Sequence, residues 1–251
     1  MIDPASPLTD YSIIIPAFEE EQLLPAALAS VHQAIKGTPL LGEIVVCDNN
    51  SRDKTAEVAR AAGAKVVFEP VNQISRARNT GARAALGRYL VFLDADSELS
   101  PDLLRGALEA LQSGRVVGGG ALVEAHFPSR GARVALALWN AVSSWRRLAA
   151  GSFVFCLREA FAEVGGFSER VYASEEIWLS RTLKRWGRRR GLAFVVLDRP
   201  RVRTSSRKDD WYPAWLLFLT AVLFALFPFL VLSRRFCWVW YRRPSSPEKK
   251  V

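Results

Sequence analysis

Apolar and polar positions follow two alternating patterns over the first hundred residues. Short runs rich in Val, Ile, Leu and Phe predict strands, and longer stretches with apolar residues every three or four positions predict helices. The predicted strands are Tyr11–Pro16, Glu43–Cys47, Ala64–Glu69 and Arg88–Leu93. The predicted helices are Glu20–Ile35, a helix through Ala62 capped from the segment 50–53, and Ser75–Leu86.

These strands are apolar along their whole length, which is typical of parallel strands buried on both faces. The alternation therefore predicts an α/β fold, a mostly parallel sheet with helices on both faces. Ligands of such sheets bind at the carboxyl ends of the strands. After residue 100 the pattern is less regular, and it predicts the helices Pro101–Gln112, Gly131–Ala149 and Ser174–Trp186 and the strands Val116–Phe127, Ser152–Cys156 and Leu192–Leu197.

The C-terminal part differs from the rest of the chain. Trp211–Ser233 is a run of 23 residues without a charge, long enough to cross a bilayer, which needs roughly 20 apolar residues. Pro228 interrupts the run and basic residues follow it, so a re-entrant hairpin or an in-plane helix fits as well as a crossing. A buried helix of the globular fold is the alternative. We expect membrane attachment, in the in-plane or hairpin form.

Charge divides the chain in two. The net charge is +9, yet residues 1–100 hold 9 Lys and Arg against 13 Asp and Glu, and the remainder holds 25 against 12. The basic excess predicts an anionic partner, but the acidic first part and the lack of a recognised motif argue against nucleic acid. The three scattered cysteines indicate neither a disulfide framework nor a zinc site, and the N-terminus lacks a signal-peptide pattern. We therefore expect the main domain to lie in the cytosol.

Acidic side chains follow three of the predicted strands. Glu19 follows the first strand, Asp48 the second, and Asp94 and Asp96 the fourth. In a parallel sheet these carboxylates converge at one edge, where they repel each other unless they bind cations or hydrogen-bond donors. Mg²⁺ or Mn²⁺ with a diphosphate would satisfy them, because these ions take one or two carboxylates together with substrate phosphates. The alternative is that the acidic residues only stabilise the starts of helices.

Four short segments stand out in the first hundred residues: SIIIPAFEEE (12–21), VVCDNNSRDKT (45–55), ARNTG (77–81) and FLDAD (92–96). In order and spacing they resemble the signatures of family 2 inverting glycosyltransferases. Gly166-Phe167 followed by Glu175-Glu176 is similar to that family's later, acceptor-side pattern. The resemblance covers roughly residues 11–207.

The resemblance implies a GT-A fold, a nucleotide-diphosphate sugar as donor, and Mg²⁺ or Mn²⁺. It implies that Asp48 contacts the base, Asp94 the ribose or sugar, and Asp96 the metal. Arg207 lies in a late segment similar to one found near the donor diphosphate in some members, although a basic patch against anionic lipid is the alternative. The remaining donor-binding residues that it implies are Pro16, Phe18, Glu19, Asn50, Arg78 and Asn79.

Inverting transfer needs a general base, which the family places as the Asp of a Glu-Asp pair at the start of a helix. Here the pair is Glu175-Glu176, so Glu176 occupies that position. Glu reaches one methylene further than Asp, and Glu175 is the alternative base. Both residues would also stabilise a helix N-terminus capped by Ser174 without any catalytic role.

Together these features predict a family 2 type hexosyltransferase at the cytoplasmic face of the membrane. Residues 1–207 would form the GT-A domain, with a donor half at about 11–100 and an acceptor half at about 101–207. Residues 208–251 would form a hydrophobic membrane-associating tail with basic flanks. The donor would be a UDP- or GDP-sugar and the acceptor lipid-linked or membrane-embedded, as in cell-envelope polysaccharide or glycolipid synthesis. The alternative is a non-catalytic subunit that binds the nucleotide sugar and recruits a partner at the membrane.

Overall fold

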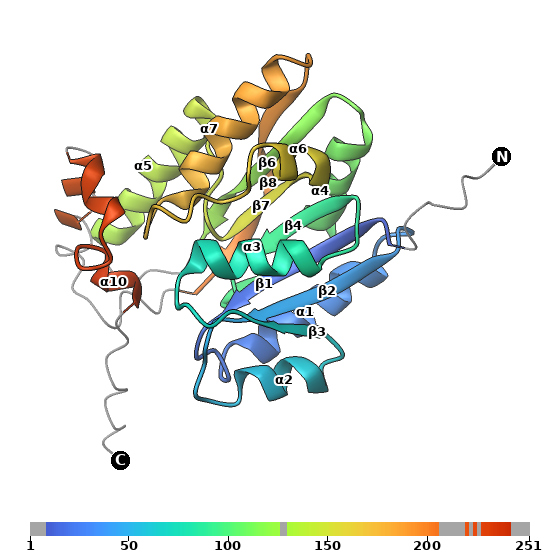
Figure 1. Cartoon of the computed structure of the whole chain (residues 1–251). Coiled ribbons are helices and arrows are strands. Elements are labelled where there is room, and N and C mark those ends of the chain that lie inside the picture. Colours follow the sequence, from blue (N-terminus) through green and yellow to red (C-terminus); the bar gives the residue numbers. More distant parts are fainter. Residues whose placement is uncertain (1–8, 126–129, 206–218, 221–222, 225–226, 242–251) are drawn as a thin grey trace.

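The computed structural model describes residues 9–125, 130–205, 219–220, 223–224 and 227–241 (Figure 1). Its centre is an eight-stranded sheet in the order β3-β2-β1-β4-β7-β6-β8-β5. The strands are β1 (Tyr11–Ala17), β2 (Gly42–Asp48), β3 (Lys65–Phe68), β4 (Tyr89–Leu93), β5 (Ser97–Glu98), β6 (Val116–Glu124), β7 (Phe153–Leu157) and β8 (Ala193–Thr204).

Strands β1 to β4 form the parallel half that the apolar runs predict. β1 pairs in parallel with β2 and β4, and β2 with β3. The other half is mixed, because β7 runs antiparallel between β4 and β6, and β5 runs antiparallel to β8. The prediction of a mostly parallel sheet thus holds for the first half and needs correction for the second. Apolar content does not encode the direction of a strand. Here the direction of β7 depends on how the chain turns back after the helix Arg130–Arg146.

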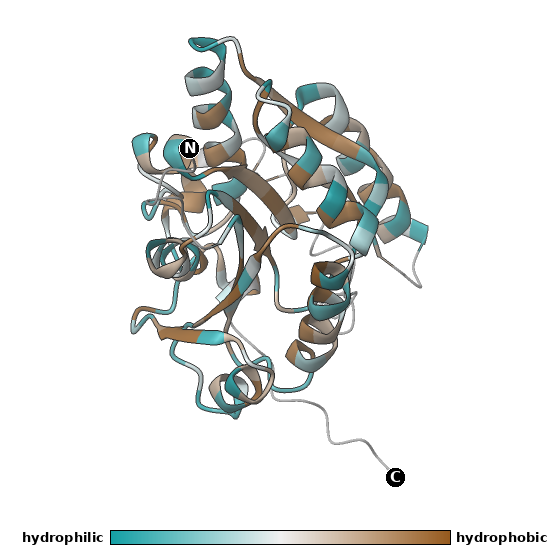
Figure 2. Cartoon of the chain, turned by 90° about the vertical axis from the view of Figure 1, so that its right-hand side faces the viewer, coloured by the Kyte–Doolittle hydropathy of each residue, from teal (hydrophilic) through white to brown (hydrophobic). Residues whose placement is uncertain are grey.

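Helices cover both faces of the sheet, as predicted. Alternate residues of β1 point to opposite faces, so Ile13 and Ile15 join one core cluster and Ile14 joins the other. In Figure 2 the apolar colour follows the strands, and the helices turn polar residues outward. The helices are α1 (Leu24–Lys36), α2 (Thr55–Ala61), α3 (Ile74–Ala84), α4 (Pro101–Gln112), α5 (Arg130–Arg146), α6 (Arg158–Glu163) and α7 (Glu175–Arg188).

One helix start and one helix cap differ from the sequence prediction. α1 begins at Leu24 rather than Glu20, because Pro25 suits the first helical turn and the residues before it bond elsewhere. The backbone N–H of Glu20 donates to Thr55 Oγ1 at 2.7 Å. α7 does begin after Ser174, but Ser174 adopts a left-handed conformation and makes no side-chain cap.

One strand prediction also needs correction. β8 continues seven residues past Leu197 to Thr204, through polar sequence that does not read as a strand. It continues because Val202 pairs with Val123 of β6, and Thr204 pairs with Ser97 of the short strand β5. A strand near the sheet edge tolerates exposed arginines and a proline, which apolar patterning alone cannot identify.

Much of the predicted apolar tail, and Arg207 with it, lies outside the described residues. The described part holds the short helices η1 (Pro228–Leu232) and α10 (Trp238–Tyr241). There Val231 and Cys237 pack against Val171 and Ala173, just before α7. None of the helices within the described ranges combines the length and the apolar character needed to cross a bilayer.

Candidate functional site

The ends of β1 and β2 lie side by side and hold each other in place. Ala17 of β1 pairs with Asp48 of β2. The next residues, Phe18 and Glu19, are half-buried, and Glu19 takes a left-handed φ of 52° while its N–H donates to Ser51 Oγ at 2.9 Å. Asp48 is buried and accepts a hydrogen bond from the backbone N–H of Ser51 at 3.0 Å. The predicted donor residues Pro16, Phe18, Glu19 and Asp48 therefore come together at the carboxyl edge of the sheet.

The predicted donor residue Asn50 has different surroundings. It is exposed, with a left-handed φ of 67°, and its Nδ2 donates to the carbonyl of Pro70. Its neighbour Asn49 is buried and links three segments. Asn49 Nδ2 donates to the carbonyls of Glu69 and Val71, and its Oδ1 accepts from the N–H of Gln73 at 2.9 Å. Asn49 thus fixes the start of α3 relative to β2.

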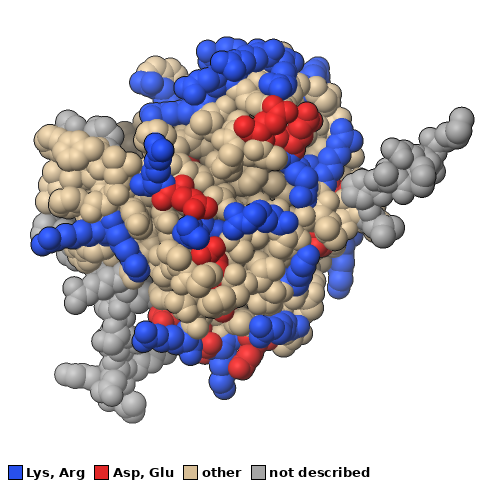
Figure 3. All heavy atoms as spheres, viewed as in Figure 1, with Lys and Arg blue, Asp and Glu red and all other residues tan. Residues whose placement is uncertain are grey.

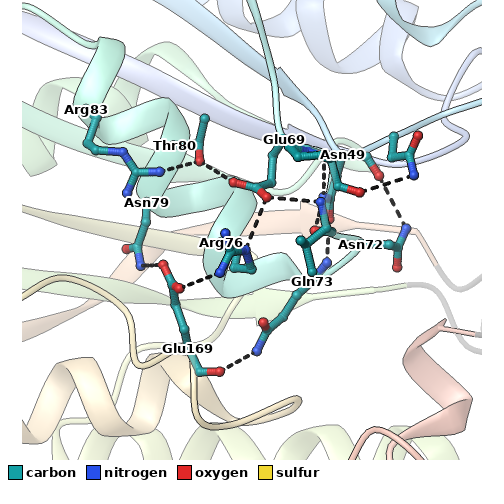
Figure 4. A network of polar contacts seen from close by, with 12 residues as sticks. Asn49, Glu69, Asn72, Gln73, Arg76, Asn79, Thr80, Arg83 and Glu169 are labelled. Carbon is teal, nitrogen blue, oxygen red and sulfur yellow. Dashed lines mark hydrogen bonds and ion pairs between the residues drawn. The ribbon is translucent and has the colours of Figure 1, made fainter.

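Glu69 is the centre of a second group of contacts that sequence reasoning missed (Figure 4). It accepts hydrogen bonds from Thr80, the N–H of Val71 and Arg76. Burial alone would raise the pKa of Glu69, but these donors outweigh burial and hold the pKa below its ordinary value. The sequence did contain a signal for Glu69, namely its position. Glu69 directly follows β3, just as Asp48 ends β2.

Gln73, just before α3, and Arg76 and Asn79 on α3 connect this network to the loop before α7. Gln73 Nε2 donates to the carbonyls of Glu169 and Val171, and Arg76 pairs with the Glu169 carboxylate at 2.9 Å. Asn79 is buried and bonds to both the N–H and the carbonyl of Phe167, each at 2.9 Å. The structure therefore gives Asn79 a structural role, holding the Gly166–Phe167 turn. Its predicted contact with the donor stays a prediction.

Arg78 is the most deeply buried charged residue of the site, with 1% of its surface exposed. Its Nη2 donates to Asp94 Oδ1 at 2.7 Å and to the Gly151 carbonyl at 2.8 Å, and its Nη1 donates to Glu175. The guanidinium also lies 5.1 Å from the centre of the Phe167 ring. Burial alone would lower the pKa of Arg78, but the neighbouring carboxylates outweigh burial and raise it. Arg78 thus joins Asp94, which follows β4, to Glu175 at the start of α7.

The two aspartates after β4 face different partners. Asp94 pairs with Arg78, whereas Asp96 accepts a hydrogen bond from Ser205 Oγ at 2.7 Å. Both carboxylates are half-buried at the carboxyl edge of the sheet. Asp96 lies next to the strand pair β5–β8, and the N–H of Ser205 donates to its carbonyl. The segment after β8 therefore orients Asp96.

The residues present fit a divalent cation that is shared with a substrate. Among the described residues, no three acidic, histidine or cysteine side chains form a cluster able to hold a metal on their own. Mg²⁺ usually takes only one or two protein carboxylates and completes its shell with water and phosphates. The half-buried Asp96 carboxylate suits that role better than Asp94, which already pairs with a guanidinium.

The first turn of α7 carries two glutamates in different states. Glu175 is buried and ion-paired with Arg78. Glu176 is half-buried, and a Cβ placed on Gly151 would lie 3.7 Å from its carboxyl group. Burial and the negative charge of Glu175 raise the pKa of Glu176 to about 8, although Arg78 acts in the opposite direction. Glu176 therefore holds its proton more tightly than an ordinary glutamate does.

Residues 12–161 match the model of "Glycosyl transferase family 2", which is more than half of the chain. The chain belongs to this family. An uncharacterized glycosyltransferase of Mycobacterium bovis is 33% identical over 103 residues, 41% of this chain and 44% of that protein. A dolichyl-phosphate beta-glucosyltransferase of Drosophila melanogaster is 36% identical over 104 residues, 36% of this chain and 32% of that protein. The chain spans less than half the length of these family relatives.

Solved structures show the same fold. A crystal structure of glucosyl-3-phosphoglycerate synthase from Mycobacterium tuberculosis, in complex with Mn²⁺, UDP and glucosyl-3-phosphoglycerate, aligns with a TM-score of 0.61 at 21% identity. That alignment covers 86% of this chain and 79% of the synthase. S. aureus TarS residues 1–349 align with a TM-score of 0.59 at 16% identity, over 86% of this chain and 66% of TarS. The GT-A fold implied by the sequence is thereby confirmed.

Proposed function

We propose that this chain transfers a hexose from a UDP- or GDP-sugar to a membrane-linked acceptor, with inversion at the anomeric carbon and help from Mg²⁺ or Mn²⁺. The observation that carries the proposal is the buried cluster around Arg78. It ties Asp94, at the strand edge where donors bind in this fold class, to the glutamate pair that faces the acceptor side. A donor bound at the carboxyl edge of the sheet and an acceptor bound at α7 would thus both lie beside the ion pairs of Arg78.

The contacts of the cluster favour one of the two candidate bases. The Glu175 carboxylate is already ion-paired with the buried Arg78 guanidinium. Glu176 makes no ion pair with a described residue, and its pKa of about 8 is matched to proton transfer near neutral pH. We therefore assign Glu176 as the base and Glu175 as a positioning residue.

In the proposed step, the acceptor oxygen attacks the anomeric carbon on the face opposite the diphosphate. The new carbon–oxygen bond forms while the bond to the diphosphate oxygen breaks, and the acceptor proton passes to the Glu176 carboxylate. The carbocation-like transition state resembles that of glycoside hydrolysis. The chain's own contribution is to fix Glu175, the residue next to the base, through Arg78, which also binds Asp94 at the strand edge.

A divalent cation bound by Asp96 and the donor diphosphate would supply charge neutralisation for the leaving group. Ser205 holds the Asp96 carboxylate in place for this role. Pro16, Phe18, Glu19 and Asp48 would frame the nucleoside, and Asn50 and Arg207 remain candidates for outer contacts with the donor.

Three observations support a membrane-linked acceptor, which we propose is reached from the cytoplasmic face. Several relatives are named for lipid or lipid-phosphate acceptors, including an undecaprenyl-phosphate 4-deoxy-4-formamido-L-arabinose transferase of Pseudomonas fluorescens, 35% identical over 104 residues. Trp211–Ser233 is an uncharged apolar run. The basic residues around it suit anionic headgroups. Residues 208–251 would then serve as the membrane-associating tail of the domain formed by residues 1–207.

The test is transfer by the purified chain, supplied with UDP- and GDP-sugars, Mn²⁺ and polyprenyl-phosphate or lipid-linked sugar acceptors in vesicles. We expect a product of inverted anomeric configuration by NMR, lost on chelation of the metal and in Asp96→Ala. Asp102→Ala, which changes an exposed aspartate outside the site, is the matched control. Retained configuration would refute the mechanism. Donor binding without hydrolysis or transfer would refute catalysis and favour a binding subunit.

A further inference from the structure

Helix α5 exposes an apolar face that no described element covers. Val134, Leu138, Val142 and Trp145 are 59%, 60%, 43% and 76% exposed. Their spacing of four, four and three residues places them on one side of the helix. Large apolar side chains scattered singly on a surface are ordinary, but a continuous stripe along one helix marks an interaction site.

The other side of α5 holds the helix to the domain. Asn140 is buried and bonds to both the N–H and the carbonyl of Val123, at 3.0 and 2.9 Å. Leu136 and Trp139 pack against the main core cluster. The helix is therefore firmly seated by one face, and the exposed stripe points away from the sheet.

Basic side chains gather at the C-terminal end of the stripe. Lys184 of α7 donates to the carbonyl of Arg146 at 2.7 Å, and Arg146 lies over the Trp145 ring at 4.5 Å. Burial and four neighbouring arginines lower the pKa of Lys184. We refer to these five residues as the basic cluster: Arg146, Arg147, Arg181, Lys184 and Arg188.

The basic cluster has no acidic counterpart in the described structure. None of its members forms an ion pair with an acidic residue in the described ranges, although Arg190 further along the chain pairs with Glu163. In Figure 3, Lys and Arg crowd the upper part of the molecule, where α7 lies in Figure 1. Like charges held this close repel each other, so an anionic partner would stabilise them.

The stripe leads directly to the proposed acceptor side. Six residues after Trp145 comes Gly151, whose carbonyl accepts from Arg78 and which lies beside Glu176. Trp178, two residues after Glu176, is 42% exposed. In the view of Figure 1, α5 and the C-terminal helices lie towards the same end of the molecule. Exposed apolar side chains also occur there, at Leu219, Leu223, Phe227, Phe229, Leu232, Phe236 and Trp238.

We propose that α5 is an interfacial helix that docks the chain on an anionic bilayer, with the stripe among the acyl chains and the basic cluster on the headgroups. An apolar stripe with tryptophan, bordered by arginine, is the signature of a helix lying in the membrane plane. A protein partner would not require an apolar stripe next to the basic cluster. Anionic lipid matches both, because its acyl chains are apolar and its headgroups are negative. Docking places Glu176 at the bilayer surface. The idea that docking delivers the acceptor to Glu176 rests on the proposed function. The docking of α5 on the bilayer does not.

The test is a fluorescence measurement that reports on α5 alone, whether or not the tail also binds lipid. Cys47, Cys156 and Cys237 are buried, so an environment-sensitive label on Leu138→Cys is selective. Vesicles of phosphatidylglycerol with phosphatidylcholine should shift its emission to shorter wavelength, and brominated acyl chains should quench it. The matched control is the same label on Leu41→Cys, a position 64% exposed, which should not respond.

Arg146→Gln with Arg147→Gln should weaken binding to the anionic vesicles by about tenfold or more, since each basic residue contributes about 1 kcal/mol at such a surface. Vesicles of phosphatidylcholine alone should bind weakly in all variants. No shift at position 138, or an equal shift at position 41, would overturn the proposal. A shift that follows protein concentration without lipid would indicate a second copy and would also overturn it. Docking without sugar transfer would instead refute the proposed function and leave this inference standing.

Discussion

At the residue scale, Arg78 shows how one side chain can connect two parts of a site. Its context in the sequence, A-R-N-T-G, implies contact with the donor phosphates. In the structure its guanidinium is occupied by Asp94, the Gly151 carbonyl and Glu175. A buried guanidinium with two carboxylate partners is stabilised only while all members are present, because each removed partner leaves an uncompensated buried charge.

We therefore expect Arg78→Met to destabilise the chain by about 3–5 kcal/mol, as removal of one partner from a buried ion pair does. Urea unfolding followed by circular dichroism measures the change. Arg83→Met is the control, because Arg83 lies on the same helix but is exposed and bonds only to Thr80, so a change within about 0.5 kcal/mol is expected. Equal losses in both variants would show that the buried cluster is not the cause.

Glu176 should control the rate and its pH dependence. Glu176→Gln should lower kcat by about 10²–10⁴-fold, the usual contribution of general acid–base catalysis, with donor affinity unchanged. Because the base must be deprotonated, the wild-type kcat/KM should rise with pH up to about 8 and then level off. Glu176→Asp should retain part of the rate. A flat pH profile in the wild type would argue against this base.

At the element scale, the contact between α3 and the turn before α7 couples the two halves of the chain. Asn79 of α3 binds the backbone on both sides of Phe167, and Gln73 binds two carbonyls of the following loop. Gly166 makes this approach possible. It has a φ of 71°, and a Cβ there would lie 2.6 Å from Asn79 Oδ1.

Gly166→Ala should cost more than Gly165→Ala, which is its matched control. Both positions have a left-handed φ, of 71° and 80°, so each alanine should cost about 1–2 kcal/mol. Only at 166 does the new methyl displace Asn79, which should add about 1–3 kcal/mol for its lost buried hydrogen bonds. Chemical unfolding of the two variants separates these effects. Equal costs would mean that the Asn79 contact contributes little.

Elements also show where sequence patterning reaches its limit. The apolar runs of β1 to β4 predict their strands, because a strand buried on both faces must be apolar throughout. The second half of β8 carries Arg199, Arg201 and Arg203 and does not look like a strand. It pairs with residues of β5 and β6 that lie about 80 to 110 positions away in the sequence. A pattern read over a short stretch of sequence does not contain these partners.

At the scale of the whole molecule, the raised pKa of Glu176 makes stability depend on pH. The folded chain binds this proton more tightly than the unfolded chain, whose ordinary pKa is 4.5 against about 8 when folded. Between these values the folded state holds more protons, so stability decreases as pH rises. The melting temperature of Glu176→Gln relative to wild type should therefore increase from pH 5 to pH 8 and change little above that. A difference independent of pH would contradict the shifted pKa.

The charge division of the whole chain also gains a physical meaning. The acidic first part gathers carboxylates at the carboxyl edge of the sheet, where we propose that Asp96 binds a cation. Part of the basic excess lies on α5 and α7, in the basic cluster beside the exposed stripe. The net charge of +9 is thus the sum of an acidic first part and a basic remainder, which favour partners of opposite charge.

The sequence by itself determined the family, the parallel half of the sheet and the residues at its carboxyl edge. These features depend on local periodicity and on short motifs, which are complete within ten or so residues. The tertiary structure decided what long-range contacts control: the direction of β7, the pairing of β8, the contacts of Asn49 and Glu69, and the different surroundings of Glu175 and Glu176. That difference depends on Arg78, 97 positions from Glu175, because the partners of a buried carboxyl are its neighbours in space rather than in sequence.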